Sequence, residues 1–222
     1  MDTRYIKNLP AISPEEQDQL KLKKILIAGC GGLGGYLFEY ALRLGVGSVR
    51  LMDGDCFKDS NLNRQLLADS DTLDVFKVIA ASDRAKKINP NVNVEVFTSY
   101  IDRSNAFDSV FDCDVVLDGL DNVKSRKLLL KACAKANIPY IYGSVSGWTA
   151  QAAVIMPGEQ GLKPLLSKAE TADDGILAFT PALCAAMESA LCLRLLCGRE
   201  VESGKLHCID LLNMDFESLS IK

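Results

Sequence analysis

Apolar and polar positions alternate in blocks along the first two thirds of the chain. Short apolar runs of strand length occur at 24–29, 48–53, 92–97, 114–120 and 138–144. Amphipathic stretches with a helical period separate most of them. This alternation predicts a doubly wound, mostly parallel α/β sheet of the Rossmann type, with a helix after each strand.

Local signals mark several helix ends. Ser13 is followed by a proline and two glutamates, a capping box that predicts a helix from Pro14 to about Leu22. Asn89-Pro90 ends an amphipathic segment that begins near Leu73. The other expected helices are 32–47, which closes at Gly45 or Gly47, a short one between 97 and 114, and 124–137.

The pattern changes after residue 143. The segment 149–158 has strand character with no helix before it, which predicts a small antiparallel C-terminal extension. Residues 160–175 are polar and irregular and predict a surface crossover. An apolar helix at 178–197 and one or two strands within 205–219 complete the chain. We expect one domain with three parts: an arm and helix (1–22), a nucleotide-binding part (23–143) and the remainder (144–222).

Composition narrows the class of protein. The 222 residues are 48% hydrophobic and 24% charged, as in ordinary globular domains, and the net charge is −4. No long run of Lys and Arg is present, which disfavours a nucleic-acid partner. No uninterrupted apolar stretch is as long as a membrane span, and the N-terminus lacks the apolar region of a signal peptide. We therefore expect a cytoplasmic protein with no membrane contact.

The eight cysteines form no C-x-x-C pair, and His207 is the only histidine. Several cysteines stand in apolar surroundings, so we expect them to be buried and reduced. This pattern encodes no two-pair zinc site.

A glycine-rich loop follows the first predicted strand. Gly29, Gly31 and Gly34 fit the G-x-G-x-x-G fingerprint, in which a nucleotide phosphate lies on a helix N-terminus. Gly31 and Gly32 would let the phosphate approach the backbone. The alternative is a glycine-rich turn that holds nothing.

Asp53 ends the second predicted strand, 19 residues after Gly34. An acid at this distance suits a ribose hydroxyl. A dehydrogenase that uses NAD and an enzyme that consumes ATP would both need it, so these two motifs leave both alternatives open.

The loop after the second predicted strand distinguishes an ATP-consuming enzyme from an NAD-dependent dehydrogenase. It carries Asp55, Asn61, Asn63 and Arg64, and Lys77 follows 13 residues after Arg64. A triphosphate that is cleaved needs cations at its leaving oxygens, and Arg and Lys serve that purpose. The local sequence around Lys77 alone favours a solvated position on the polar face of its helix.

Asp118 and Asp121 come at the carboxyl end of another predicted parallel strand, on the same edge as the glycine loop. Carboxylates beside a triphosphate repel it unless Mg²⁺ lies between them, which makes Asp121 a candidate magnesium ligand. Alternatively, Asp121 and Asn122 cap the next helix, and both roles are compatible.

Taken together, "GCGGLG", Asp53, "SNLNRQ", Lys77, "LDGLDN" and "YGSVSGWTAQ" resemble, in order and spacing, the ThiF/MoeB/HesA family, relatives of ubiquitin-activating enzymes. "RYIKNLP" near the start is similar to the N-terminal segment of that family. The resemblance covers about residues 4–158 and again the segment 174–198.

The resemblance implies an adenylyltransferase. Its substrates would be Mg-ATP and the C-terminal Gly-Gly carboxylate of a small ubiquitin-like sulfur-carrier protein, and it would act as a homodimer. Arg64, Lys77 and Asp121 would be catalytic, with Asp121 on the magnesium. The implied ATP contacts are Gly29, Gly31, Gly32, Asp53, Asp55, Ser60, Asn61, Leu62, Asn63, Arg64, Lys77, Asp121 and Asn122. Because a C-terminal carboxylate is already ionised at pH 7, the reaction needs no general base.

This sequence departs from the family in three ways. Lys7 stands where the family has an arginine that reaches the other subunit's site, and Arg4 is the other cation nearby. The C-x-x-C zinc motif of many members is missing. The crossover at 160–175 has no cysteine, and we expect Cys184, in an apolar helix, to be a core residue. The sequence therefore favours adenylation without a covalent enzyme–carrier step.

Other functions stay open at this point. One is the activation of another carboxylate, such as that of a modified tRNA nucleoside, although the lack of a basic stripe disfavours it. The NAD-dependent dehydrogenase on the same fold leaves Arg64, Lys77 and Asp121 unexplained. A nucleotide-binding regulator that has lost turnover is the third.

Overall fold

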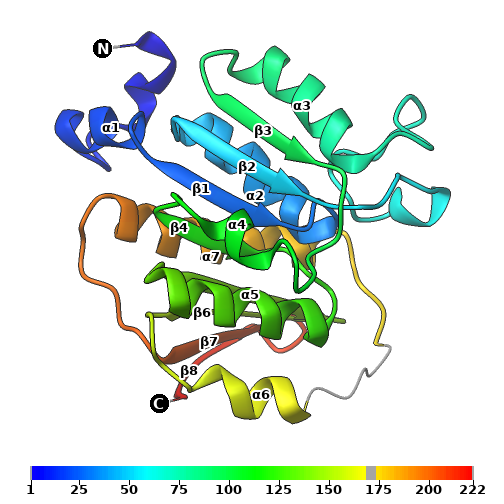
Figure 1. Cartoon of the computed structure of the whole chain (residues 1–222), viewed down its shortest axis with the longest axis vertical. Coiled ribbons are helices and arrows are strands. Elements are labelled where there is room, and N and C mark those ends of the chain that lie inside the picture. Colours follow the sequence, from blue (N-terminus) through cyan, green and yellow to red (C-terminus); the bar gives the residue numbers. More distant parts are fainter. Residues whose placement is uncertain (1, 169–173, 222) are drawn as a thin grey trace.

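All strands found in the described residues, 2–168 and 174–221, join one eight-stranded sheet in the order β3-β2-β1-β4-β5-β6-β7-β8. The computed structural model is shown in Figure 1. The strands are β1 (Lys24–Ala28), β2 (Ser48–Met52), β3 (Asn93–Phe97), β4 (Val115–Asp118), β5 (Tyr140–Ser146), β6 (Thr149–Ile155), β7 (Lys205–Asp210) and β8 (Asp215–Ser220).

The pairing divides this sheet into two parts. Strands β3 to β5 pair in parallel, and β5 to β8 pair antiparallel. Strands β1, β2 and β4 are almost entirely buried because helices cover both faces, which explains their continuous apolar sequences. The predicted doubly wound sheet with an antiparallel C-terminal extension is confirmed.

Helices pack on the two faces of the sheet as two layers. The helices are α1 (Pro14–Leu20), α2 (Gly32–Leu44), α3 (Lys77–Ile88), α4 (Ala106–Val110), α5 (Val123–Ala136), α6 (Leu162–Lys168) and α7 (Phe179–Leu196), with short 3-10 segments η1 (Thr3–Asn8) and η2 (Asp59–Asn61). The core of one face joins side chains of α2, α3 and α7, and the core of the other joins α4, α5 and α6.

The predicted caps are present where the sequence marked them. Ser13 and Glu16 form the capping box of α1, with Pro14 at its first position. Helix α2 ends at Gly45, whose φ of 82° is left-handed, so the first of the two predicted stops is used.

Two sequence predictions need correction. Helix α3 begins at Lys77 rather than near Leu73, because residues before it form isolated bridges to the preceding loop and Asp74 has a φ of 62°. The crossover predicted at 160–175 contains the helix α6, which buries Leu162 and Leu166 against the core. Residues 169–173 of that crossover lie outside the described residues.

Helix α7 has 18 residues and a mean hydropathy of 1.4, so its length and composition would allow it to cross a membrane. It is instead packed against α2, β5 and β6, with Cys184, Glu188 and Cys192 buried in the interior. Its apolar character is therefore accounted for by the protein core.

The carboxyl ends of β1, β2, β4 and β5 meet at one edge of the sheet, at the right in Figure 1. The glycine loop, the loop after β2 and the start of α5 all lie at this edge. The N-terminal arm lies at the opposite edge.

Candidate active site

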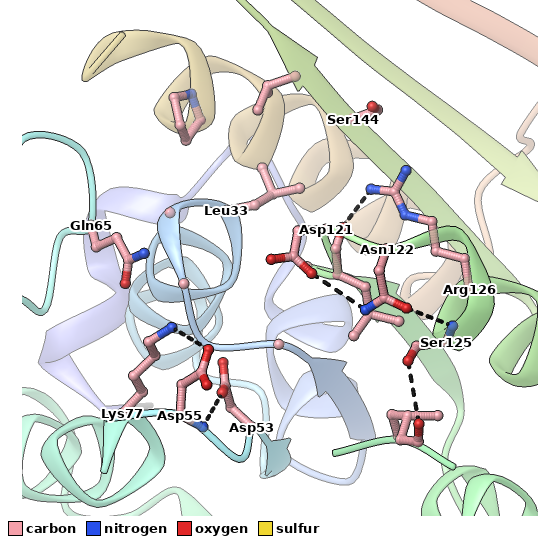
Figure 2. Close-up of a pocket in the computed structure, with 18 of the residues that line it drawn as sticks. Leu33, Asp53, Asp55, Gln65, Lys77, Asp121, Asn122, Ser125, Arg126 and Ser144 are labelled. Carbon is pink, nitrogen blue, oxygen red and sulfur yellow. Dashed lines mark hydrogen bonds and ion pairs between the residues drawn. The ribbon is translucent and has the colours of Figure 1, made fainter. Parts of the chain in front are cut away.

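A cavity of about 400 Å³ opens at the carboxyl edge of the parallel strands. Residues from the loops after β1, β2, β3 and β4, from β5 and from the start of α7 line it (Figure 2). This is the position at which open α/β sheets bind ligands. Among the sequence-predicted residues it includes Gly29, Gly31, Gly32, Asp53, Asp55, Arg64, Lys77, Asp121 and Asn122.

The glycines of the loop have two different functions. A Cβ at Gly34 would lie 1.9 Å from the carbonyl oxygen of Gly29, and one at Gly29 would lie 2.4 Å from that of Gly119, so both positions need glycine for the fold. At Gly32 a Cβ would make ordinary van der Waals contact with Pro181, whose nearest atom would lie 3.5 Å away, so the fold itself does not need glycine there. Helix α2 begins there without a side-chain cap, and its N-terminal N–H groups face the cavity as an anion site.

Asp53 is held by the backbone on both of its carboxylate oxygens. The N–H of Cys30 donates to Oδ2 at 2.7 Å, and that of Asp55 donates to Oδ1 at 2.8 Å. A carboxylate has about four acceptor positions, so these two bonds fix its orientation and still leave room for a ligand hydroxyl.

Lys77 is buried, and the local prediction of a solvated side chain is wrong. Its backbone N–H donates to the carbonyl of Asp55, and its Nζ lies 3.2 Å from Asp55 Oδ2. Because α3 begins at Lys77, the side chain turns toward the cavity and away from the polar face of the helix. Figure 2 shows its ammonium group beside Asp55.

Tyr100 extends this contact. Its hydroxyl donates to Asp55 Oδ1 at 2.5 Å. Hydrogen bonds from Tyr100 and from Lys77 hold the pKa of Asp55 below its ordinary value, against the effect of partial burial. Tyr100 therefore helps to keep Asp55 ionised as the partner of Lys77. Nothing in the local sequence pointed to Tyr100.

Arg64 is anchored to its own loop by one guanidinium nitrogen. Its Nη1 donates to the carbonyl of Ser60 and to Asn63 Oδ1, both at 2.8 Å, so other donors are available to the cavity. Ser60, Asn61, Leu62 and Asn63 do not themselves line the cavity. Instead, Asn63 donates to the carbonyl of Ile176 and so ties this loop to the chain before α7.

Asp121 and Asn122 are both exposed, and they have different contacts. Asn122 caps α5 by accepting the N–H of Ser125 at 2.9 Å, as the capping alternative predicted. Asp121 takes no part in that cap. Its carboxylate accepts one contact from the Asn122 amide at 3.3 Å and points into the cavity in Figure 2. Both alternatives for this pair are thus compatible with the structure.

A buried polar cluster supports the floor of the cavity. Asp118 is fully buried and is paired with Arg126, whose Nε lies 3.1 Å from Oδ2; the hydroxyl of Tyr140 also donates to it. Arg126 Nη2 donates to the carbonyls of Leu120 and Gly143. Asp118 is thereby fully occupied, which leaves Asp121 as the carboxylate of this strand end that is open to the cavity.

Glu188, from α7, lies behind this cluster. It is fully buried next to Gly143, and its Oε2 has no hydrogen-bond partner. Burial first, and then the charge of Asp118, raise the pKa of Glu188 well above its ordinary value. Burial also raises the pKa of Asp118, and the guanidinium of Arg126 opposes that rise.

Several residues of this region were missed by the sequence reasoning. Gln65 is buried, lines the cavity and has an unpartnered Oε1; it stood within the quoted "SNLNRQ" motif. Arg126 could have been found one turn into the helix after Asn122. Tyr140 and Glu188 carried no signal, because only tertiary packing brings them to Asp118.

The remaining predicted candidates lie elsewhere. Arg4 donates to Asn89 Oδ1 within the arm region, and Lys7 is exposed; neither lines the cavity. His207 is on β7, with Nδ1 2.8 Å from Ser218 Oγ and its ring stacked on Phe216. Cys184 is buried with its thiol against the carbonyls of Gln151 and Ser144, and burial raises its pKa well above the ordinary value.

A doubly wound sheet with a glycine loop, a ribose-type acid and buried cations at its carboxyl edge defines a nucleotide-binding α/β protein. Residues 3–222 match the ThiF family, and the chain belongs to this family. The resemblance inferred from the sequence is thus confirmed.

Named relatives cover nearly the whole chain. A protein named SAMP-activating enzyme E1 from Haloferax volcanii is 29% identical over 97% of this chain and 84% of its own length. The sulfur carrier protein adenylyltransferase of Thermus thermophilus is 29% identical over 96% of this chain and 84% of its own length. Protein HesA of Leptolyngbya boryana is 32% identical over 82% of this chain and 68% of its own length.

Solved structures share the fold. E. coli MccB with ATP superimposes with a TM-score of 0.83 at 22% identity, covering 100% of this chain and 72% of that chain. PaaA superimposes with a TM-score of 0.80 at 23% identity, covering 93% of this chain and 66% of that chain. At this identity the likeness supports the architecture alone.

Proposed function

We propose that this protein is an ATP-dependent adenylyltransferase that activates the C-terminal Gly-Gly carboxylate of a small ubiquitin-like sulfur-carrier protein and releases pyrophosphate. One observation carries the proposal: the glycine loop lines the same cavity as Arg64, Lys77 and Asp121. The names of relatives as SAMP-activating enzyme and sulfur carrier protein adenylyltransferase support it. They favour ATP consumption over the dehydrogenase alternative.

The chemistry is a displacement at the α-phosphorus of ATP. A carboxylate oxygen of the carrier forms a bond to phosphorus, and the bond from phosphorus to the bridging oxygen of pyrophosphate breaks. The carboxylate is ionised at pH 7, so no proton has to be removed. Catalysis then depends on in-line placement and on positive charge at the oxygens that gain negative charge.

The described side chains divide these tasks. Asp53, fixed by two backbone N–H groups, accepts from the ribose hydroxyls. The N-terminus of α2 holds phosphate oxygens beside Gly32. Lys77 and Arg64 supply charge to the leaving pyrophosphate, and Tyr100 and Asp55 position the Lys77 ammonium.

Asp121 suits magnesium by its chemistry. Mg²⁺ is commonly held by one or two protein carboxylates together with substrate phosphates, and Asp121 offers a carboxylate that is free of cationic partners in the described residues. The bound ion would neutralise phosphate charge. Asp118 is unsuited to this role because Arg126 and Tyr140 occupy it.

The buried thiol of Cys184 supports a reaction that ends at the carrier adenylate, without an enzyme-bound thioester. Its raised pKa keeps the sulfur protonated, and it is packed against backbone carbonyls. A nucleophilic cysteine needs an accessible thiolate.

The proposal includes a cytoplasmic homodimer without nucleic-acid or membrane contact. The N-terminal arm lies at the far edge of the sheet (Figure 1). Lys7 is exposed on this arm and is the cation that would reach the phosphates of the second subunit's site. Arg4 is the poorer candidate because its guanidinium is bound to Asn89.

The test is ATP–pyrophosphate exchange with a Gly-Gly-ended carrier. Exchange should depend on the carrier and should disappear when the last glycine of the carrier is removed. Arg64→Ala and Asp121→Ala should abolish it, with unchanged thermal unfolding as the control for folding. Exchange that is equally fast without the carrier, or absent with every Gly-Gly-ended carrier, would refute the proposal; the latter result is the one expected of a regulator.

A further inference from the structure

Helix α5 presents a continuous stripe of lysines. Lys124, Lys127, Lys131 and Lys135 are all exposed, and their steps of three, four and four residues place them on one face. The opposite face buries Ser125, Arg126, Leu129, Ala132 and Cys133. The expectation of a chain without a basic stripe is therefore wrong: the linear sequence separates the lysines, and the helix brings them together.

This stripe is not neutralised by the protein itself. Helix α5 contains no acidic residue, and none of the four lysines has an ion pair among the described residues. By contrast, Lys21, Lys23, Lys24, Lys77, Lys86 and Lys205 are each paired with a carboxylate. Lys135 is placed over the ring of Phe107, and Asp102, near Lys124, is hydrogen bonded to Ser104.

The stripe is also unfavourable for the helix. Lys127, Lys131 and Lys135 are spaced by four residues, and like charges at this spacing destabilise a helix. For Lys135, in the last turn, the helix dipole and the ring of Phe107 partly offset this effect. A protein of net charge −4 thus concentrates unpaired positive charge on one helix face, at a cost in local stability. A partner that supplies the opposite charge would offset this cost.

Helix α5 begins next to the cavity. The helix starts at the rim of the cavity, since Asn122, Ser125 and Arg126 line it, and the lysines extend about 16 Å from there along the outer face. In Figure 1, α5 lies at the surface between α4 and α6. A protein whose C-terminal tail occupies the cavity has its folded part just outside it.

We propose that the lysine stripe of α5 is the docking surface for an acidic face of the carrier protein's folded domain. The proposal rests on the proposed function, because it assumes that the occupant of the cavity is the tail of a protein. Four charges that continue from the tail site suit a small protein surface, where such charges raise the association rate and select the partner. A nucleic acid is less well suited, since α5 itself carries no aromatic side chain for base stacking and the rest of the chain is acidic; the exposed Phe111 lies only at the far end of the stripe, next to Phe107 under Lys135.

The double variant Lys127→Glu/Lys131→Glu tests this surface, because neither residue lines the cavity. The matched control is Lys86→Glu/Lys87→Glu on α3, which changes the net charge equally on exposed positions. Steady-state exchange is measured with the intact carrier and, separately, with a synthetic peptide of its last residues ending in Gly-Gly.

The α5 variant should raise the KM for the intact carrier about tenfold or more at low salt, with a smaller effect at high salt. Its KM for ATP and its KM for the tail peptide should be unchanged, and its thermal unfolding should be no lower than that of the parent. The control should keep all three KM values of the parent, although it loses the ion pair between Lys86 and Asp83. An unchanged KM for the intact carrier would overturn the docking surface. So would an equal increase for the peptide, because that would place the effect in the cavity.

A tRNA titration distinguishes a protein-docking surface from a nucleic-acid surface. Bulk tRNA is titrated against the parent and the α5 variant at physiological salt. Weak binding that is equal in the two proteins is the expected result. Tight binding that the variant loses, together with an unchanged KM for the carrier, would make the stripe a nucleic-acid surface and overturn the proposal.

The proposed function can also fail by itself, if no Gly-Gly-ended carrier or peptide supports exchange. In that case fluorescently labelled poly-L-glutamate is the probe for the stripe. Binding that is lost in the α5 variant alone supports an acidic protein partner, whereas no binding overturns it.

Discussion

Two buried cations lie close to strand β2, and they have very different surroundings. Arg50, in the middle of the strand, forms ion pairs with Glu95 through Nε and with Asp112 through Nη2. Its Nη1 donates to the carbonyls of Ser109 and Phe111. Lys77, beside the loop after the strand, has one carboxylate partner, Asp55, and lines the cavity.

The difference shows how a buried charge can be assigned to structure or to function. The guanidinium N–H groups of Arg50 donate to protein acceptors, and these bonds connect the end of α4 to β2 and β3. The ammonium of Lys77 has three donors, and it lines the cavity in which we propose that ATP binds. Both cations are buried, so burial does not distinguish them. Lys77 differs from Arg50 because it has donors without a protein acceptor in the described part of the chain and lines the cavity.

The largest effect is expected for Lys77→Met. Removal of a positioned cation from the departing pyrophosphate should lower the exchange rate by about 10³-fold or more. Thermal unfolding should change little, because Asp55 keeps its bond from Tyr100. Pyrophosphate exchange and a melting curve on the same preparation check both parts. A variant that keeps a rate within tenfold of the parent would remove Lys77 from the catalytic group.

Arg50→Met should give the opposite result. It leaves Glu95 and Asp112 with Lys24 alone and leaves buried carbonyls without a donor, which should cost about 3–5 kcal/mol of unfolding free energy. Urea unfolding measures this loss. The exchange rate of the folded variant, well below its melting temperature, should equal that of the parent. A specific loss of exchange without loss of stability would break the distinction between the two cations.

Glu188→Gln tests the raised pKa of the buried acid beneath the cavity. The pKa of Glu188 is raised in the folded protein, so the unfolded chain loses its proton first as the pH increases from about 4.5. The parent therefore loses stability as the pH rises above that value, by at most about 1.4 kcal/mol per pH unit. The glutamine cannot ionise, so the stability of the variant relative to the parent should increase from pH 5 to pH 8. A constant difference across this range would show that Glu188 is ionised when folded.

Tyr100→Phe should have the smallest effect. Asp55 loses one of its two side-chain partners, and the orientation of Lys77 becomes looser. We expect a decrease in kcat of about three- to tenfold, with little change in stability because Tyr100 and its hydrogen bond to Asp55 are exposed to solvent. Tyr36→Phe on α2, outside the cavity lining, is the matched control. A decrease in both variants would exclude a specific role for Tyr100.

Local patterns were sufficient to predict much of this molecule. The apolar runs of the parallel strands, the capping box at Ser13 and the glycine loop are recorded in adjacent residues, because the physical constraints on them are themselves local. The same holds for Asp53, whose place at the end of β2 follows from the strand. The order and spacing of the motifs also predict that Arg64, Lys77 and Asp121 lie at one edge of the sheet, and all three line the cavity there.

What could not be predicted depends on contacts between distant elements. The burial of Lys77 follows from the late start of α3, which the bridges of the preceding loop determine. The raised pKa of Glu188 arises because α7 packs behind Asp118, and Tyr100 reaches Asp55 from the loop after β3. The lysine stripe of α5 could have been found from helical spacing, and it was missed because charge was judged along the linear sequence.

The central claim is that the carrier's terminal carboxylate attacks the α-phosphorus of ATP in this cavity. The most direct measurement uses a carrier labelled with ¹⁸O in that carboxylate, with hydroxylamine to release the product and mass spectrometry of the nucleotide. The account predicts AMP that carries one ¹⁸O, because the bridging oxygen of the adenylate comes from the carboxylate. Unlabelled AMP, or ADP as the product, would contradict it.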